Sequence, residues 1–96
     1  MAILSFADER MSNFFYEGKI PSKIGWNSIH SVARRKLDML HYSHTLLDLR
    51  SPPGNHLEEL KGNLKSFYSI RINNQWRIIF QWTDSGPARV DMVDYH

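Results

Sequence analysis

Three consecutive residues, Asp94, Tyr95 and His96, carry a carboxylate, a phenol and an imidazole. An imidazole titrates near neutral pH and can move a proton, and a phenol can hydrogen-bond a phosphate. Two arginines, Arg71 and Arg77, precede them in segments rich in aromatic and β-branched residues. Arginine offers a planar fork of donors and stays charged, which suits a phosphodiester. Together these residue types fit a phosphate site, in which fixed cations stabilise developing charge and a histidine delivers a proton. Solvated arginines and an incidental histidine are the alternative interpretation.

The alternation of side chains along two expected strands, 67–72 and 76–82, places the arginines. Successive side chains of a strand face opposite sides of the sheet. One face therefore carries Phe67, Ser69 and Arg71 from the first strand and Arg77, Ile79 and Gln81 from the second. The other face carries Tyr68, Ile70, Ile72, Trp76, Ile78, Phe80 and Trp82, which we assign to the core rather than to a base-stacking platform. We expect Arg71 and Arg77 on the exposed face, where they could converge with Lys61.

The whole pattern predicts an α+β fold and one domain spanning residues 1–96. The expected elements are a strand at 2–6, helices at 7–16 and 26–40, short segments at 45–49 and 57–60, and strands at 67–72, 76–82 and 88–93. The second helix is the clearest, because its apolar residues recur every three or four positions. Asn73-Asn74 and residues 84–87 are typical turns, so the last three strands form an antiparallel meander. We expect the N-terminal strand and both helices to pack on one face of a mainly antiparallel sheet.

Composition narrows the function classes. The chain has 96 residues, no cysteine and no apolar run near the roughly 18 residues of a membrane span. These features exclude a disulfide framework and a cysteine nucleophile, and they favour a cytoplasmic protein without a membrane partner. The net charge is +2, with seven basic and five acidic residues in 1–55 and five of each in 56–96. A broad electrostatic grip on nucleic acid is therefore not supported, and any such activity needs a few placed cations or a larger partner.

Two further clusters admit more than one interpretation. The basic run 34–36 interrupts the apolar stripe of the second helix, either as a solvated outer face or as a surface that meets ribosomal RNA or an acidic partner segment. His41 and His44 lie three residues apart, as a pair of metal ligands would. No third ligand is evident, however, and histidine near a helix C-terminus is favoured by the helix dipole. We therefore predict no metal and no cofactor.

The joint spacing of many residues carries a family resemblance across nearly the whole chain. The relevant residues are Pro52-Pro53-Gly54-Asn55, Leu57-Glu58, Leu60-Lys61-Gly62, Tyr68-Ser69-Ile70-Arg71-Ile72-Asn73, Gln75-Trp76-Arg77-Ile78, Phe80, Trp82, Gly86 and Val93-Asp94-Tyr95-His96. In this spacing the chain resembles the HigB toxins of the RelE/ParE superfamily. The resemblance implies the toxin of a type II toxin–antitoxin system and a RelE-like fold. It also implies an endonuclease that cuts translated mRNA in the ribosomal A site without a metal.

The same resemblance implies the chemistry and the partners. The 2′-hydroxyl of the RNA attacks the adjacent phosphorus and leaves a 2′,3′-cyclic phosphate and a 5′-hydroxyl. The companion is a HigA-like helix-turn-helix antitoxin, which neutralises the toxin and binds operator DNA together with it. The remaining partners are the 30S subunit of the ribosome and mRNA.

Site residues follow from the resemblance position by position. Lys61 matches a family lysine that serves as base or transition-state cation, and Arg77 matches the phosphate clamp. His96 is the expected proton donor, Tyr95 positions the substrate, Asp94 orients His96, and Arg71 is a second cation. One departure concerns Glu58, which stands where some HigB toxins have a histidine. Glu58 is either a surface carboxylate at a strand end or a replacement that transfers the proton.

Two other functions stay open at this point. A ParE-like toxin would bind gyrase and cut no RNA, and such binders do not require the set formed by Lys61, Arg77, Tyr95 and His96. A non-toxic component of a repressor complex would keep the fold without the activity.

Overall fold

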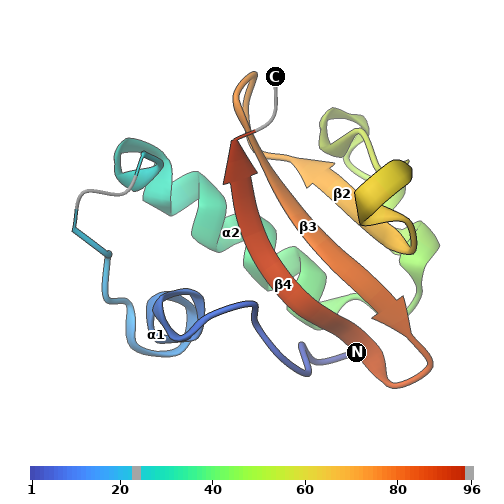
Figure 1. The fold of residues 1–96 in the computed structure, drawn as a ribbon, viewed down its shortest axis with the longest axis horizontal. Coiled ribbons are helices and arrows are strands. Elements are labelled where there is room, and N and C mark those ends of the chain that lie inside the picture. Colours follow the sequence, from blue (N-terminus) through green and yellow to red (C-terminus); the bar gives the residue numbers. More distant parts are fainter. Residues whose placement is uncertain (23–24, 95–96) are drawn as a thin grey trace.

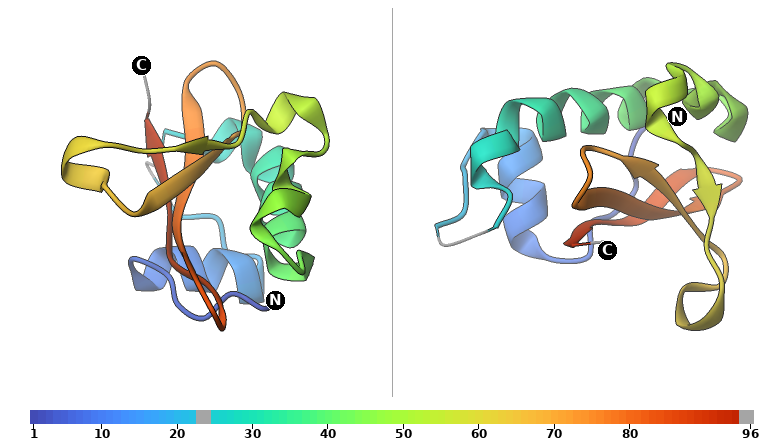
Figure 2. Two further views of the ribbon diagram at one scale, coloured as in Figure 1. Left: turned by 90° about the vertical axis from the view of Figure 1, so that its right-hand side faces the viewer. Right: turned by 90° about the horizontal axis from the view of Figure 1, so that it is seen from above.

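The computed structural model describes residues 1–22 and 25–94. It contains the helices α1 (Glu9–Glu17) and α2 (His30–Tyr42) and the strands β1 (Glu58–Glu59), β2 (Phe67–Arg71), β3 (Trp76–Thr83) and β4 (Gly86–Asp94). Short 3₁₀ turns lie at Asn27–Ile29, Leu46–Arg50, Pro53–Asn55 and Gly62–Leu64. The strands form one antiparallel sheet in the order β1-β2-β3-β4, which confirms the predicted α+β fold and its meander. Helix α2 lies across one face of the sheet and α1 stands on the β4 side (Figures 1 and 2).

Local capping interactions set both ends of α1. Asp8 caps α1, since its Oδ1 accepts a hydrogen bond from Met11 N at 3.1 Å. Gly18 ends α1 with a left-handed backbone, φ 73°. Helix α2 begins at His30 rather than at Trp26, because a 3₁₀ turn precedes it. None of the helices among the described residues has the length and apolar character of a membrane span.

The core lies between α2 and the sheet face that turns toward it. Ala33, Leu37 and Leu40 of α2 are fully buried, as their spacing predicts, and so are Ile78 and Phe80 of β3. Trp76, Trp82 and Tyr68 pack against this cluster, which confirms their assignment to the core.

The hairpin between β2 and β3 turns at Asn73, as the sequence predicts. Its Oδ1 accepts hydrogen bonds from Gln75 N at 2.9 Å and from Trp76 N at 2.7 Å. Further along, the β3–β4 ladder is interrupted by a bulge between Ile79 and Gln81.

The prediction of a strand at residues 2–6 is wrong, although the segment does lie along the sheet. Residues 2–6 make only one bridge, between Phe6 and Val90, and it is parallel. The segment does run along β4, because Val90 N donates to Ser5 O at 3.1 Å and Ala7 N donates to Val90 O at 2.9 Å. It stays short because Ile3 N donates to the side chain of His41 instead, and because the helix cap begins immediately after Ala7.

Candidate functional site

Arg77 is held on the sheet face opposite α2, which we call the open face. We expected its guanidinium to be exposed, and that expectation is wrong, since only 7% of Arg77 is exposed. Its Nε donates to Ser69 Oγ at 2.8 Å, and its Nη2 donates to the backbone carbonyl of His56 at 2.6 Å. The loop that precedes β1 folds against this part of the sheet and buries the guanidinium. Arg77 is therefore a cation whose guanidinium is held in one position by these two hydrogen bonds.

The same loop, residues 51–56, is held from the helical layer. Asn55 is fully buried, and its Nδ2 donates to Leu49 O at 3.1 Å and to Ser51 O at 3.3 Å. Its Oδ1 accepts from Lys36 Nζ of α2 at 2.5 Å. Adjacent residues of one loop, Asn55 and His56, therefore receive hydrogen bonds from a cation of each layer.

The three basic residues 34–36 of α2 do not share one environment, since one is buried and two are exposed. Lys36 is 7% exposed, so it is neither a solvated residue nor part of a surface for RNA. Burial, and then the charge of Arg35, lower the pKa of Lys36 below its usual 10.5. Arg34 lies over the ring of Phe15 at 5.2 Å and 3.6 Å from Asp38. Only Arg34 and Arg35 are left on the outer face.

Glu58 lies beside the arginine site. Strand pairing sets Glu58 opposite Ser69, whose hydroxyl accepts from Arg77. Facing residues of paired strands project to the same side of a sheet, so the Glu58 carboxylate is on the open face. Glu58 is exposed, and a surface pocket of about 500 Å³ opens over residues 58–61.

Lys61 occupies the rim of that pocket. It follows Leu60, whose N–H donates to Phe67 O at 2.9 Å, toward the end of the sheet away from Arg77. The Lys61 side chain is exposed. Lys61 lies near the Phe67 end of β2, whereas Arg71 and Arg77 lie at the other end, so the convergence of the three cations stays a prediction.

Arg71 faces Arg77 across the β2–β3 pair but serves the turn. Its Nε donates to Asn73 O at 3.2 Å, and its Nη2 donates to Asn74 Oδ1. The two arginines therefore lie at the same end of the open face, next to the β2–β3 turn, but only Arg77 binds the loop before β1.

Asp94 ends β4 opposite Trp76, at the end of β3 that also holds Arg77. Its Oδ2 accepts from Gln75 Nε2 at 3.0 Å. Tyr95 and His96, the predicted substrate positioner and proton donor, lie outside the described residues.

His41 has a packing role. Its Nδ1 accepts from Ile3 N at 3.2 Å, and its ring contacts Phe15 and Tyr42 with centroid distances of 5.1 and 4.9 Å. Across residues 1–22 and 25–94, no group of three His, Asp or Glu residues could hold a metal ion.

Three contributors to the site were not predicted to contact its charged residues. Alternation did place the Ser69 hydroxyl on the face of the arginines, so its contact with Arg77 could have been found. The buried amide of Asn55 and the carbonyl of His56 gave no such signal, because loop burial and backbone direction leave no trace in residue type.

A solved structure shares this fold. The chain superposes on a toxin of Agrobacterium tumefaciens described as a YoeB/ParE toxin, with a TM-score of 0.56, 100% coverage of both chains and 17% identity, a likeness of fold alone. The family model described as RelE-like toxin of type II toxin-antitoxin system HigB matches residues 4–96.

Sequence relatives agree with that family. The chain is 43% identical to Toxin HigB-1 of Vibrio cholerae over 97 residues, covering 97% of this chain and 96% of that protein. It is 42% identical over 80 residues to a Haemophilus influenzae protein named "Uncharacterized protein", covering 83% and 78% of the two chains. The chain therefore belongs to the HigB-like toxins of type II toxin–antitoxin systems, as the resemblance predicted, and an antitoxin is its partner.

Proposed function

We propose that this toxin is a ribosome-dependent endoribonuclease that cuts translated mRNA in the A site and thereby inhibits translation and growth. The 2′-hydroxyl oxygen forms a bond to the adjacent phosphorus, and the bond from phosphorus to the 5′-oxygen breaks. The proton of the 2′-hydroxyl passes to a base, and the 5′-oxygen receives a proton from an acid. The products are a 2′,3′-cyclic phosphate and a 5′-hydroxyl.

The observation that carries this proposal is the held guanidinium of Arg77. A buried cation with two fixed hydrogen bonds needs no reorganisation when charge develops on the phosphoryl oxygens. On the open face Arg77 lies next to Glu58, so a fixed cation and a carboxylate that could act as a base stand side by side, as a phosphodiester site would need.

The other roles are part of the proposal. Lys61 approaches from the rim as base or second cation, and its four-carbon stem gives it the reach. His96 protonates the leaving oxygen, Tyr95 positions the substrate, and Asp94 orients His96. Glu58 is the alternative base. Arg71, bound to the hairpin turn, acts as a supporting cation.

The proposed partners follow from the same function. A HigA-like helix-turn-helix antitoxin neutralises the toxin in the cytoplasm and carries it to operator DNA. The 30S A site holds the mRNA in place, so a chain of net charge +2 does not have to bind RNA tightly by itself.

The test is to map new 5′ ends of cellular mRNA after brief induction of the toxin, with Arg77→Ala as the comparison. We expect cuts inside translated codons for the wild type and none for the variant, whose fold is checked by circular dichroism. DNA damage without new 5′ ends would instead support a gyrase-binding toxin of the ParE kind. If Arg77→Ala folded and cut like the wild type, the assignment of the site would be wrong.

A further inference from the structure

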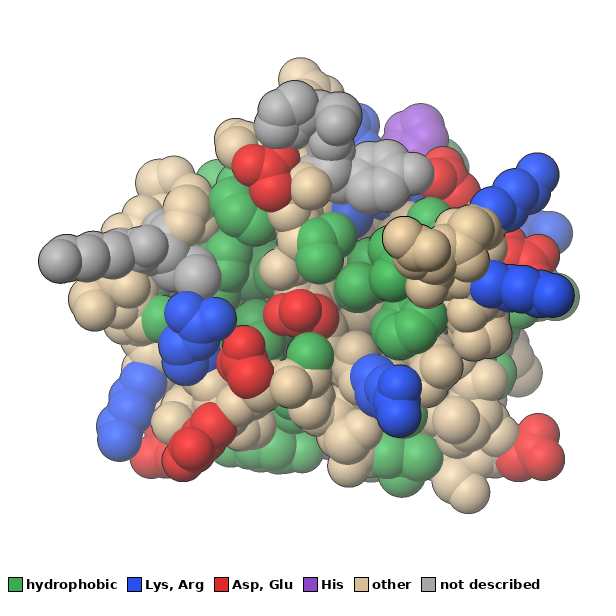
Figure 3. Space-filling model, in the orientation of Figure 1, with side chains coloured by type: hydrophobic (Ala, Val, Ile, Leu, Met, Phe, Trp, Pro, Cys, Tyr) green, Lys and Arg blue, Asp and Glu red, His purple; other side chains and the backbone are tan. Residues whose placement is uncertain are grey.

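A second hollow lies on the open face, beyond the arginine site. It is a groove of about 510 Å³ lined by Phe67, Ile79, Arg89 and Asp91 and by the N-terminal segment at Phe6. Apolar side chains come to the surface in the middle of this face, with charged side chains around them (Figure 3). The volume lies in the range of small-ligand pockets.

The floor of the groove is continuous with the site. Ile79 pairs with Ser69 on one side and with Asp91 on the other, so these three residues form one row across the sheet. Ser69 is also the residue whose hydroxyl holds Arg77. A nucleic acid whose phosphate binds Arg77 therefore has to extend by only one row of side chains to reach the groove.

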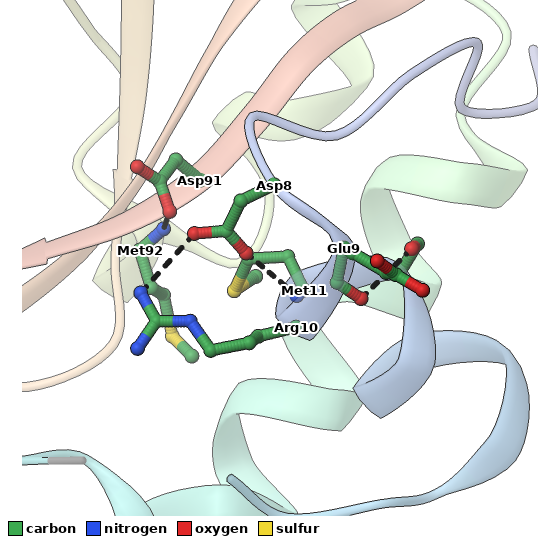
Figure 4. Close-up of polar contacts among 7 residues, drawn as sticks. Asp8, Glu9, Arg10, Met11, Asp91 and Met92 are labelled. Atoms are coloured by element: carbon green, nitrogen blue, oxygen red, sulfur yellow. Dashed lines mark hydrogen bonds and ion pairs between the residues drawn. The ribbon is translucent and has the colours of Figure 1, made fainter.

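Asp91 gives the groove a carboxylate that can accept hydrogen bonds from a ligand. One of its oxygens accepts from Met92 N at 2.8 Å, and the carboxylate lies near Asp8 and Arg10 (Figure 4). It forms no ion pair among the described residues. Burial, and to a smaller extent the charge of Asp8, raise the pKa of Asp91, against the lowering effects of Met92 N–H and Arg10. Among the described residues, the hydrogen bond from Met92 N uses a single oxygen of this carboxylate, so its second oxygen can accept from a ligand.

We propose that this groove binds the base of a nucleotide next to the cleaved phosphodiester, and that Asp91 selects adenine or cytosine, whose exocyclic amine stands where guanine and uracil carry a carbonyl. The inference rests on the proposed nuclease function. Single-stranded bases are recognised by stacking on aromatic rings and by hydrogen bonds to their edges. Phe67 supplies the ring, the Asp91 carboxylate accepts from the amine of adenine or cytosine, and exposed Arg89 meets the neighbouring phosphate.

A peptide fits this place less well. An extended peptide binds a sheet by adding a strand to a free edge. Here the adjoining edge of β4 is already taken, since Leu4 N donates to Pro87 O at 2.8 Å and Ala7 N donates to Val90 O. A base needs no backbone partners, so it can use the groove as it stands.

The test compares Asp91→Asn and Phe67→Leu with the matched control Asp84→Asn, which removes an exposed carboxylate from the β3–β4 turn. Cleavage sites are mapped across many translated messages. We expect Asp91→Asn to change the preference for adenine or cytosine over uracil roughly tenfold at one position beside the cut. Phe67→Leu should slow cleavage roughly tenfold at all sites, because a base loses its stacking ring. The control should keep the wild-type profile.

A binding measurement separates this inference from the nuclease proposal. Uncleavable 2′-O-methyl trinucleotides are titrated against purified wild type and Asp91→Asn, with tryptophan fluorescence as the readout. Wild-type preference for adenine or cytosine over uracil, lost in Asp91→Asn, supports the groove even if no cellular message is cut. Equal binding by both proteins, or an unchanged cleavage profile in an active Asp91→Asn, overturns it. The groove is instead a peptide site if both groove variants cut normally and lose affinity for the antitoxin.

Discussion

The helical layer and the sheet hold the same loop by different cations. Lys36 reaches Asn55 from α2, and Arg77 reaches His56 from β3. Both cations are 7% exposed, and both donate to uncharged oxygen atoms. They differ in what burial does to them. Burial lowers the pKa of Lys36, whereas a guanidinium remains charged in proteins. The comparison indicates that the lysine stabilises the loop, whereas the arginine combines a held position with a permanent charge, which is what the proposed phosphate site needs.

The largest expected effect is on the sheet side. Arg77→Ala should reduce mRNA cleavage by about 10²- to 10³-fold, the usual loss when one preorganised donor is removed. Arg77→Lys keeps the charge but not the planar fork, so it should recover only a small part of the rate. Rates of cleavage on programmed ribosomes measure both. A rate for Arg77→Lys equal to the wild type would show that geometry at this residue does not matter.

The next effect is on the loop. Asn55→Ala removes three hydrogen bonds and leaves the buried ammonium of Lys36 without its acceptor. We expect a loss of about 3 kcal/mol in the free energy of unfolding. Urea denaturation measures it, with exposed Asn63→Ala as a control that should stay within about 0.5 kcal/mol of the wild type. A similar small change for both variants would mean that the loop is held elsewhere.

On the helical side, Lys36→Met should cost about 1 kcal/mol at neutral pH, because Asn55 loses a donor. The pH dependence is the sharper measurement. Since the folded pKa of Lys36 lies below 10.5, the unfolded chain binds more protons between these two values, and wild-type stability gains a contribution as pH rises through that window. The difference between wild type and Lys36→Met should therefore grow with pH up to 10.5. A constant difference would contradict the shifted pKa.

The smallest effect belongs to the arginine bound to the turn. Arg71→Ala breaks its hydrogen bonds to Asn73 and Asn74, so we expect a stability loss of about 0.5 kcal/mol. Its cleavage rate should fall at least tenfold less than that of Arg77→Ala. If Arg71→Ala were the more damaging variant, the contrast between a loop-bound and a turn-bound arginine would be reversed.

The sequence correctly predicted the features that depend on the spacing of residues within one helix or strand. Alternation along β2 and β3 correctly placed Ser69, Arg71 and Arg77 on one face, and the three- and four-residue spacing correctly buried Leu37 and Leu40. The spacing of residues within one strand or helix cannot predict which other segment of the chain packs against it. The burial of Arg77 depends on where the loop at His56 returns, and that return is a tertiary property. Lys36 was misread for the same reason, since its acceptor lies 19 positions away in the chain.

The pairing of residues 4–7 with β4 has a consequence for folding. The backbone of Arg89 donates to the side chain of Ser5 across a separation of 84 positions. Contacts between such distant positions are costly to close and tend to form late. During synthesis, residues 4–7 can pair with β4 only after residues 87–90 have been made. Because Phe6 lines the groove beside Asp91, the groove has its full lining only once this long-range pairing is in place.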